Sequence, residues 1–272
     1  MATLVVAARV ATVEGSSSTE RDDLLVTEEP LEIRLGFGNS EHRREIRLSV
    51  TMRTPGHDED LVRGFLHSEG IVAREEELLR VVPCANVREE EQGNVVRAEL
   101  HPSVELDPAR WQRNFYTTSS CGVCGKSSIE AVHLQCKRPL VPMGAIDPGI
   151  LTALPERMRM AQTVFRHTGG IHAAALFDRK GELLVLREDV GRHNAVDKVI
   201  GAALSTDMPL VSSMLLVSGR AGFELVQKCV VVGVPVMAAI GAPSSLAVKL
   251  AQESGLCLIG FLRGERFNIY AS

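Results

Sequence analysis

The sequence predicts an α/β protein, with a three-layer domain of sheet and helices in its C-terminal part and a smaller α/β region before it. Over residues 214–262, short apolar segments alternate with helix-like segments. This strand–helix–strand–helix–strand order implies parallel strands joined by right-handed crossovers. In residues 31–50, apolar and polar residues alternate in two short runs, as in half-exposed strands. Hydrophobic residues make up 45% of the 272 residues, enough to bury a sizeable core.

The N-terminal part is predicted to contain a tail and an α/β region. Residues 1–20 end in small polar residues and are expected to form a flexible tail. Residues 21–110 form the N-terminal α/β region, in which three acidic residues favour the start of a helix and Gly70 can end it. The expected elements are strands at residues 31–35 and 45–50, a helix from Asp58 to Gly70, a hairpin tip at residues 89–94 and a strand at residues 95–97.

Residues 111–272 form the predicted C-terminal domain. Ser127 or Ser128 can cap a short helix that continues to Cys136, and Pro155 is expected to begin a longer one. Asn194 is expected to cap a further helix. The remaining predicted elements are a hairpin formed by residues 171–177 and 182–187, strands at 214–217, 235–240 and 256–262, and helices at 223–232 and 245–253.

Composition and charge exclude several classes of protein. A net charge of −4 argues against broad nucleic-acid binding. The longest apolar run, residues 229–242, is too short to span a bilayer, and no positive charge precedes apolar residues 1–8 as it would in a secretory signal. Six cysteines in a chain of this length do not resemble a disulfide framework. We therefore expect a cytoplasmic protein that binds neither nucleic acid nor a membrane.

Cys121 and Cys124, two residues apart, are the strongest local signal. Thiols at this spacing can share a proton, a metal or a sulfur atom, and Lys126 can lower their pKa. The residues alone leave open a sulfur relay, a redox pair, a zinc site or a pair without chemistry. The other four cysteines are singletons, so a four-ligand zinc site is disfavoured and no structural metal is expected. The preceding polar segment is a poor strand, which counts against a thioredoxin-like pair.

Small residues follow two neighbouring predicted strands. Ser218, Gly219 and Arg220 follow the first, and residues 241–245 follow the second. Backbone N–H groups at such strand-to-helix turns can bind phosphate, and in a parallel sheet both turns lie at the same edge. The alternative is that these turns only connect strands to helices, since neither matches a P-loop or a full dinucleotide fingerprint.

Three further segments carry charge that can serve a ligand. Arg192 and His193 lie near a helix start, where cations oppose the helix dipole, although a solvated first turn explains them equally well. His172 invites a metal interpretation but can equally be a hydrogen-bonded core histidine. Arg263 and Arg266 can meet an anion or belong to an ordinary charged terminal segment.

Together these segments resemble the FdhD family, the formate dehydrogenase accessory sulfurtransferases. Each match is weak alone, and their order and number make the resemblance specific. The matching stretches are residues 29–33, 52–56, 64–66, 68–71, 120–125, 168–173, 188–198, 218–220, 241–245 and 267–270.

The resemblance implies a cytoplasmic homodimer that accepts sulfur from a cysteine desulfurase. The sulfur passes to the bis(molybdopterin guanine dinucleotide) cofactor of formate dehydrogenase, whose metal is molybdenum or tungsten. Cys121 would carry the persulfide with Cys124 as its partner. The resemblance also assigns cofactor binding to Phe261, Leu262, Arg263, Gly264, Glu265 and Arg266, which join Ser218, Gly219 and Arg220 as candidate binding residues.

The family also implies a cytidine-deaminase-like fold for the C-terminal domain. A zinc deaminase uses the pattern His-x-Glu, in which the glutamate is the general acid and base. Here His172 is followed by Ala173 and Ala174, so the glutamate is missing. We therefore predict a deaminase-like fold without deaminase chemistry.

Overall fold

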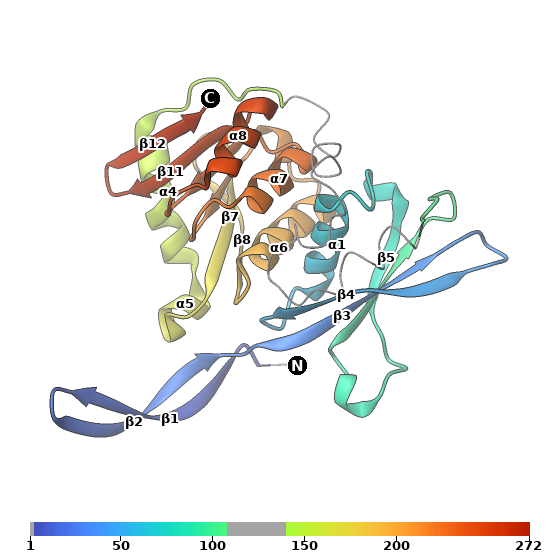
Figure 1. Ribbon diagram of the computed structural model, residues 1–272, viewed down its shortest axis with the longest axis horizontal. Coiled ribbons are helices and arrows are strands. Elements are labelled where there is room, and N and C mark those ends of the chain that lie inside the picture. Colours follow the sequence, from blue (N-terminus) through green and yellow to red (C-terminus); the bar gives the residue numbers. More distant parts are fainter. Residues whose placement is uncertain (1–2, 108–139) are drawn as a thin grey trace.

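The computed structural model describes residues 3–107 and 140–272. In these residues the strands form a two-stranded hairpin, a four-stranded sheet and a six-stranded sheet (Figure 1). Helix α1 (Asp58–Ser68) lies between the four-stranded sheet and the helices of the C-terminal domain. None of the helices in the described part of the chain is both long and apolar enough to cross a membrane.

The first element is an antiparallel hairpin that projects from the rest of the molecule (Figure 1). Strand β1 (Val5–Glu14) pairs with β2 (Ser17–Val26) along its whole length, and Gly15 takes a φ of 63° in the two-residue turn. The prediction of a flexible tail over residues 1–20 is therefore wrong for this segment. The small polar residues after Glu14 led to this prediction. In the structure, Gly15 and Ser16 form the turn that closes the hairpin.

The four-stranded sheet builds the core of the N-terminal region. Strands β3 (Glu29–Phe37) and β4 (Arg44–Arg53) are antiparallel, β3 and β6 (Val95–Leu100) are parallel, and β5 (Leu78–Pro83) forms the far edge. Leu31, Ile33 and Leu35 alternate toward the core and pack with Leu61 and Leu66 of α1. The three strands predicted here are confirmed. Strand β5 was not predicted, because its residues do not alternate cleanly.

The six-stranded sheet has the order β12-β11-β10-β9-β7-β8. Its central strands β9 (Met214–Val217), β10 (Val236–Ala239) and β11 (Cys257–Arg263) are parallel, as predicted. The predicted hairpin forms β7 (His172–Phe177) and β8 (Leu183–Asp189). Strand β12 (Arg266–Ala271) was not predicted: the charged terminal segment folds back antiparallel on β11 around Gly264, which has a φ of 53°.

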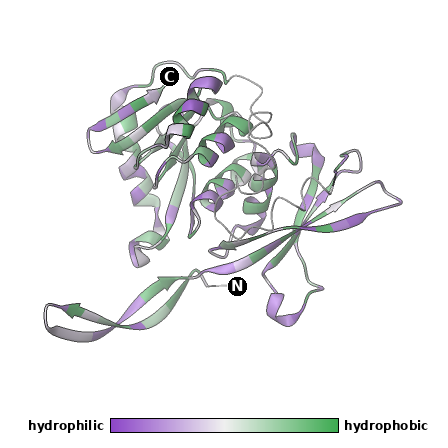
Figure 2. Ribbon diagram, in the orientation of Figure 1, coloured by the Kyte–Doolittle hydropathy of each residue, from purple (hydrophilic) through white to green (hydrophobic). Residues whose placement is uncertain are grey.

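Helices cover both faces of this sheet. Helices α6 (Arg192–Ser205), α7 (Phe223–Val232) and α8 (Ser245–Ser254) share one core cluster with it, and α4 (Pro148–Ala161) shares another on the opposite face. Along these helices hydrophobic and hydrophilic residues alternate, as in amphipathic helices that cover a sheet (Figure 2). The three-layer prediction is confirmed. The specific likeness to cytidine deaminases stays a prediction.

Two predicted helix starts are wrong. Helix α4 begins at Pro148 rather than Pro155, because the carboxylate of Asp147 accepts the N–H of Gly149 at 2.7 Å and caps the helix. The chain then breaks at Gln162 before the short helix α5 (Thr163–Thr168). Helix α6 starts one turn earlier than predicted, with Gly191 at its cap. The helix predicted to end at Cys136 and the boundary near residue 110 lie outside the described residues.

Helices α1 and α6 cross at two glycines. A Cβ atom on Gly64 would lie 1.8 Å from the carbonyl oxygen of Asp197, and one on Gly201 would lie 1.9 Å from that of Asp60. Both positions therefore require glycine for the backbones to approach this closely. Through this crossing, the N-terminal region packs directly on the helix that begins at the edge of the large sheet.

Candidate functional site

One edge of the six-stranded sheet gathers most of the predicted binding residues. The parallel strands β9, β10 and β11 all end at this edge. Strand β7 runs the opposite way, so its first residue, His172, lies at the same edge and pairs with Asp189, the last residue of β8. The topology thus brings together segments that are far apart in the sequence, as expected for a parallel sheet.

The two glycine-containing turns at this edge are hydrogen-bonded to each other. The N–H of Gly241 donates to the carbonyl of Gly219 at 2.9 Å, and the N–H of Ala221 donates to that of Ala242 at 3.2 Å. The Ser218 hydroxyl accepts the N–H of Ala173 at 2.9 Å and so ties the first turn to β7. The turns are therefore one rigid platform, and the prediction that they lie together is confirmed.

Positive charge surrounds this platform. Arg192 and His193 are half-buried in the first turn of α6, while Arg220, Arg263 and Arg266 are exposed. A Cβ atom on Gly222, which caps α7, would lie 4.0 Å from a terminal nitrogen of Arg192. Because the N-termini of α6 and α7 add the positive ends of their dipoles, this edge is suited to an anionic ligand.

The terminal segment assigned to cofactor binding forms the end of β11 and the turn into β12. Phe261 adopts a φ of 53° and donates its N–H to the carbonyl of Gly241 at 3.0 Å. Arg263 donates from Nε to the carbonyl of Ile240 at 3.1 Å, whereas Leu262 is buried in the core. Gly264, Glu265 and Arg266 are exposed at the turn. The segment therefore borders the glycine turns, except that Leu262 points away from any ligand.

The two histidines at the edge have different surroundings. Nε2 of His193 lies 2.6 Å from a carboxylate oxygen of Glu224, in the first turn of α7. His172 is half-buried beside Gly219. Burial lowers the pKa of its imidazole, and the charges of Arg192 and His193 lower it further. His172 is therefore neutral at neutral pH and can accept or donate one hydrogen bond to a ligand.

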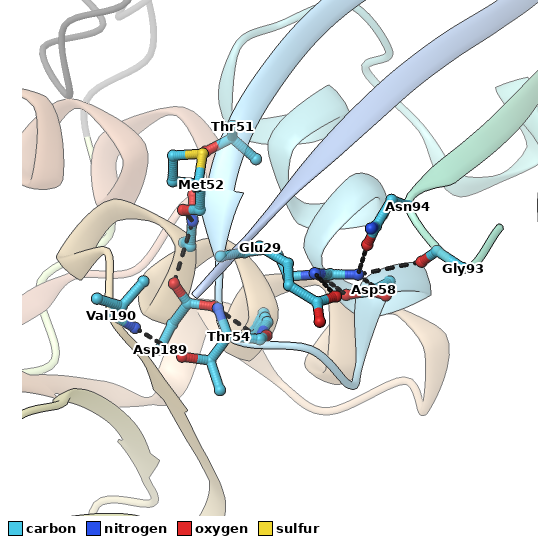
Figure 3. Close-up of polar contacts among 12 residues, drawn as sticks. Glu29, Thr51, Met52, Thr54, Asp58, Gly93, Asn94, Asp189 and Val190 are labelled. Atoms are coloured by element: carbon cyan, nitrogen blue, oxygen red, sulfur yellow. Dashed lines mark hydrogen bonds and ion pairs between the residues drawn. The ribbon is translucent and has the colours of Figure 1, made fainter. Parts of the chain in front are cut away.

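Asp189 is the hub of a buried polar network next to this edge (Figure 3). The Asp189 carboxylate accepts the N–H of Gly191 at 2.8 Å, the side-chain amide of Asn194 at 3.1 Å and the N–H of Thr54 at 3.2 Å. Lys198 pairs with it at 2.7 Å, and both charged side chains are almost fully buried. Such a buried pair is tolerated only when its remaining groups are satisfied, as they are here.

The participation of Thr54 in this network was missed by sequence reasoning. Residues 52–56 contributed to the family resemblance, but nothing in their local pattern places them against Asp189, 135 positions further along the chain. Asn194, expected as a helix cap, instead uses its side chain to bond Asp189 and the carbonyl of Met52, the latter at 2.8 Å.

Cys121 and Cys124 lie outside the described residues. Of the cysteines that the structure describes, Cys84, Cys229 and Cys257 all have thiol pKa values raised by burial, that of Cys229 to about 12. These three thiols are therefore poor nucleophiles at neutral pH. In residues 3–107 and 140–272, no group of three or more His, Cys, Asp or Glu side chains could hold a metal ion. The absence of a structural metal in the whole chain stays a prediction.

A sequence model of the FdhD/NarQ family matches residues 26–272. The chain belongs to this family. It is 52% identical over 263 residues to the "Sulfur carrier protein FdhD" of Streptomyces coelicolor, covering 95% of this chain and 90% of that protein. The protein of the same name from Mycobacterium tuberculosis is 48% identical over 271 residues, covering 96% and 95%.

The fold of this FdhD/NarQ chain also occurs in a solved structure. A crystal structure of a Desulfotalea psychrophila protein, assigned as a formate dehydrogenase accessory protein, superposes with a TM-score of 0.74 at 22% identity, covering 99% of this chain and 98% of that one. At that identity the likeness concerns the fold alone. The family resemblance inferred from short segments is confirmed, and the described geometry brings four of those segments, residues 168–173, 188–198, 218–220 and 241–245, to the same sheet edge.

Proposed function

We propose that this FdhD/NarQ chain carries sulfur from a cysteine desulfurase to the bis(molybdopterin guanine dinucleotide) cofactor of formate dehydrogenase, in the cytoplasm. Curated relatives that are about half identical over nearly the whole chain bear the name sulfur carrier protein. The observation that carries the proposal is the pair of hydrogen-bonded turns at the sheet edge, with arginine side chains beside them. In these turns the N–H of Gly241 donates to the carbonyl oxygen of Gly219 at 2.9 Å. The arginine side chains and the N-termini of α6 and α7 suit the phosphates of a dinucleotide.

The cofactor, with molybdenum or tungsten, is the substrate in this proposal. Its pyrophosphate groups are anionic, and backbone N–H groups with arginine side chains are the usual protein partners of phosphate. We assign this role to Ser218, Gly219 and Arg220 together with residues 261–266. Within that segment, Arg263 and Arg266 face solvent and can meet charge, whereas the buried Leu262 shapes the strand beneath them.

The proposal places sulfur chemistry on Cys121. The Cys121 thiolate attacks the terminal sulfur of the desulfurase persulfide, a new S–S bond forms, and the desulfurase cysteine leaves as a thiolate. The terminal sulfur then travels on Cys121 to the substrate. In release, the Cys124 thiolate attacks the inner sulfur of that persulfide, a Cys121–Cys124 disulfide forms, and hydrosulfide leaves toward the metal. A cellular dithiol then reduces the disulfide and restores both thiols.

Incubation of the protein with a cysteine desulfurase and free cysteine tests this proposal. Peptide mass spectrometry should find Cys121 heavier by one sulfur atom. A Cys121–Cys124 disulfide that forms without a persulfide on Cys121 and without release of hydrosulfide would indicate a thiol–disulfide redox protein instead. An unmodified Cys121 in a protein that still binds the cofactor would indicate a noncatalytic chaperone.

We also propose that the protein acts as a homodimer, which the family resemblance implies. Two bound copies would place two sheet edges in one particle, matching a cofactor that carries two guanine dinucleotide arms. Light scattering at micromolar concentration should return twice the mass of one chain. The mass of a single chain across that range would contradict the proposal.

A further inference from the structure

The turn that leads into α6 is held by a segment of the N-terminal region. Thr54 bonds it twice: its N–H donates to the Asp189 carboxylate at 3.2 Å, and its hydroxyl accepts the N–H of Val190 at 3.2 Å. Its carbonyl also accepts from Lys198 at 2.7 Å. The N–H, hydroxyl and carbonyl of Thr54 thus all form hydrogen bonds with residues 189–198. The residue is 2% exposed.

The preceding residue, Arg53, fixes this segment to the N-terminal region (Figure 3). Its guanidinium, 1% exposed, bonds both carboxylate oxygens of Asp58 at 3.0 and 3.1 Å and pairs with Glu29 at 3.3 Å. It also donates to the carbonyl of Gly93 and to the side chain of Asn94. These partners come from β3, the start of α1 and the approach to β6. Arg53 therefore holds Thr54 in place from three elements at once.

The two residues before Arg53 bind the first turn of α6. The carbonyl of Met52 accepts from the side-chain amide of Asn194 at 2.8 Å, and the hydroxyl of Thr51 donates to the amide oxygen of Asn194 at 3.2 Å. Asn194 lies directly after Arg192 and His193. The segments on both sides of Arg192 and His193, the Asp189–Gly191 turn and Asn194, are thus bound to residues 51–54.

We propose that the N-terminal region has a positioning function: through Thr54 it holds the Asp189–Gly191 turn, and so aims Arg192 and His193 at the ligand of the sheet edge. A positive charge in the first turn of a helix is opposed by the helix dipole, so the placement of Arg192 has to be imposed from outside. No local cap does this, because Gly191 has no side chain. The nature of the ligand rests on the function proposed above. The Thr54 clamp, meaning the hydrogen bonds of Thr54 to Asp189, Val190 and Lys198, rests only on the geometry.

A matched pair of substitutions isolates the clamp. Thr54→Val keeps the shape of the side chain but removes the acceptor for the Val190 N–H, and Thr54→Ser keeps that acceptor. Ser68→Ala is the control for general weakening, since Ser68 bonds Asp197 at 2.7 Å and Lys228 at 2.8 Å in a second buried contact between the two regions. Urea unfolding of all three variants establishes that each is folded.

Hydrogen–deuterium exchange of the unliganded protein gives the first measurement. In Thr54→Val, the amides of residues 190–193 should exchange about fivefold faster, because the loss of one hydrogen bond lowers the cost of opening the turn. Thr54→Ser and Ser68→Ala should leave these amides at the parent rate. Unchanged exchange in a folded Thr54→Val protein would overturn the proposal.

Affinity for guanosine diphosphate, used as the probe, gives the second measurement. Binding to Thr54→Val should be about two- to tenfold weaker than to the parent, with Thr54→Ser and Ser68→Ala close to the parent value. Equal weakening by Ser68→Ala would mean general destabilisation and would overturn the positioning role, as would faster exchange with unchanged affinity. If the parent itself does not bind the probe, the nucleotide site is wrong, and the exchange experiment alone decides whether Thr54 holds the turn.

Discussion

At the scale of single residues, several ionisable side chains in the described part of the chain are buried, and oppositely charged neighbours keep some of them charged. Lys228 is fully buried in α7 and pairs with Glu69 at 3.0 Å and Asp197 at 2.9 Å. These carboxylates raise the pKa of Lys228 in spite of burial, so the lysine stays charged. Buried pairs of this kind contribute little net stability, but they define which elements pack together.

His67 gives a prediction about acid sensitivity. Burial in α1 lowers the pKa of its imidazole from 6.5 to about 4, and the charge of Arg63 adds to the effect. Nε2 of His67 also lies 3.1 Å from a carboxylate oxygen of Glu75, but that carboxylate is paired with Arg63. Between these values the unfolded chain binds a proton that the folded chain does not. The stability due to neutral His67 is therefore complete above pH 6.5 and is lost as the pH falls toward 4. From His67 alone we expect the free energy of unfolding to fall by about 2 kcal/mol between pH 7 and about pH 5.

Urea unfolding at both pH values measures this loss. His67→Gln, which cannot titrate, should lose distinctly less stability over the same interval. His42→Gln serves as the control, since His42 is exposed, and should keep the parent's dependence on pH. A parent and a His67→Gln variant with the same pH dependence would contradict a neutral, buried His67.

At the scale of elements, the glycine crossing of α1 and α6 determines how the two regions fit. A Cβ atom on Gly201 would meet the backbone of Asp60, which cannot rotate away as a side chain can. Gly201→Ala should therefore lower the free energy of unfolding by about 1–3 kcal/mol, although alanine favours helices elsewhere. Urea unfolding measures the effect. Gly170→Ala, where a Cβ would be 3.7 Å from its nearest neighbour, should cost much less, and equal costs would refute the close crossing.

Elements with strong local signals could be predicted from the sequence, and those that depend on distant partners could not. The strands and helices between residues 214 and 263 are bounded by glycines such as Gly233 and Gly255, both in the left-handed conformation, and their limits fall within two residues of prediction. The start of α4 was missed because Pro148 and Pro155 are equally good local signals, and only the bond to the Asp147 carboxylate decides between them.

For the candidate site too, the features with a local sequence signal could be predicted and those that depend on distant partners could not. The parallel topology was predictable from the order of elements, and it correctly placed Ser218–Arg220 beside residues 241–245. The role of Thr54 was not predictable, because its partners Asp189 and Val190 are more than a hundred residues away and the hydrogen bonds leave no periodic pattern. Hydrophobic periodicity reports which face is buried, but not which polar groups meet there.

At the scale of the whole molecule, α1 packs against both the four-stranded sheet and helix α6 of the C-terminal domain. Arg187 of β8 also pairs with Asp60 of α1 at 2.9 Å, so the N-terminal region contacts the C-terminal domain through an ion pair, a helix crossing and the Thr54 clamp. In the proposed function, this frame would hold the cofactor in a fixed position. In the same proposal, the thiol of Cys121 carries the sulfur to this cofactor.

The last prediction concerns that thiol. We expect Cys121→Ala to abolish maturation of formate dehydrogenase, because no persulfide can form without the Cys121 sulfur. Folding and guanosine diphosphate binding should be retained, since the substitution removes a single sulfur atom and the residues assigned to nucleotide binding, 218–220 and 261–266, do not include Cys121. Cys124→Ala should also impair maturation, by slowing release of the persulfide. The measurements are formate dehydrogenase activity and the sulfur content of its cofactor in cells that carry each variant.

Cys84→Ala is the matched control for this experiment. Cys84 is half-buried, and burial raises the pKa of its thiol, so it should contribute no sulfur chemistry and its replacement should leave formate dehydrogenase active. A loss of activity with Cys121→Ala and not with Cys84→Ala ties maturation to one thiol rather than to thiols in general. Full activity with Cys121→Ala would exclude the relay, even though the chain belongs to the FdhD/NarQ family and even if the sheet edge binds the nucleotide.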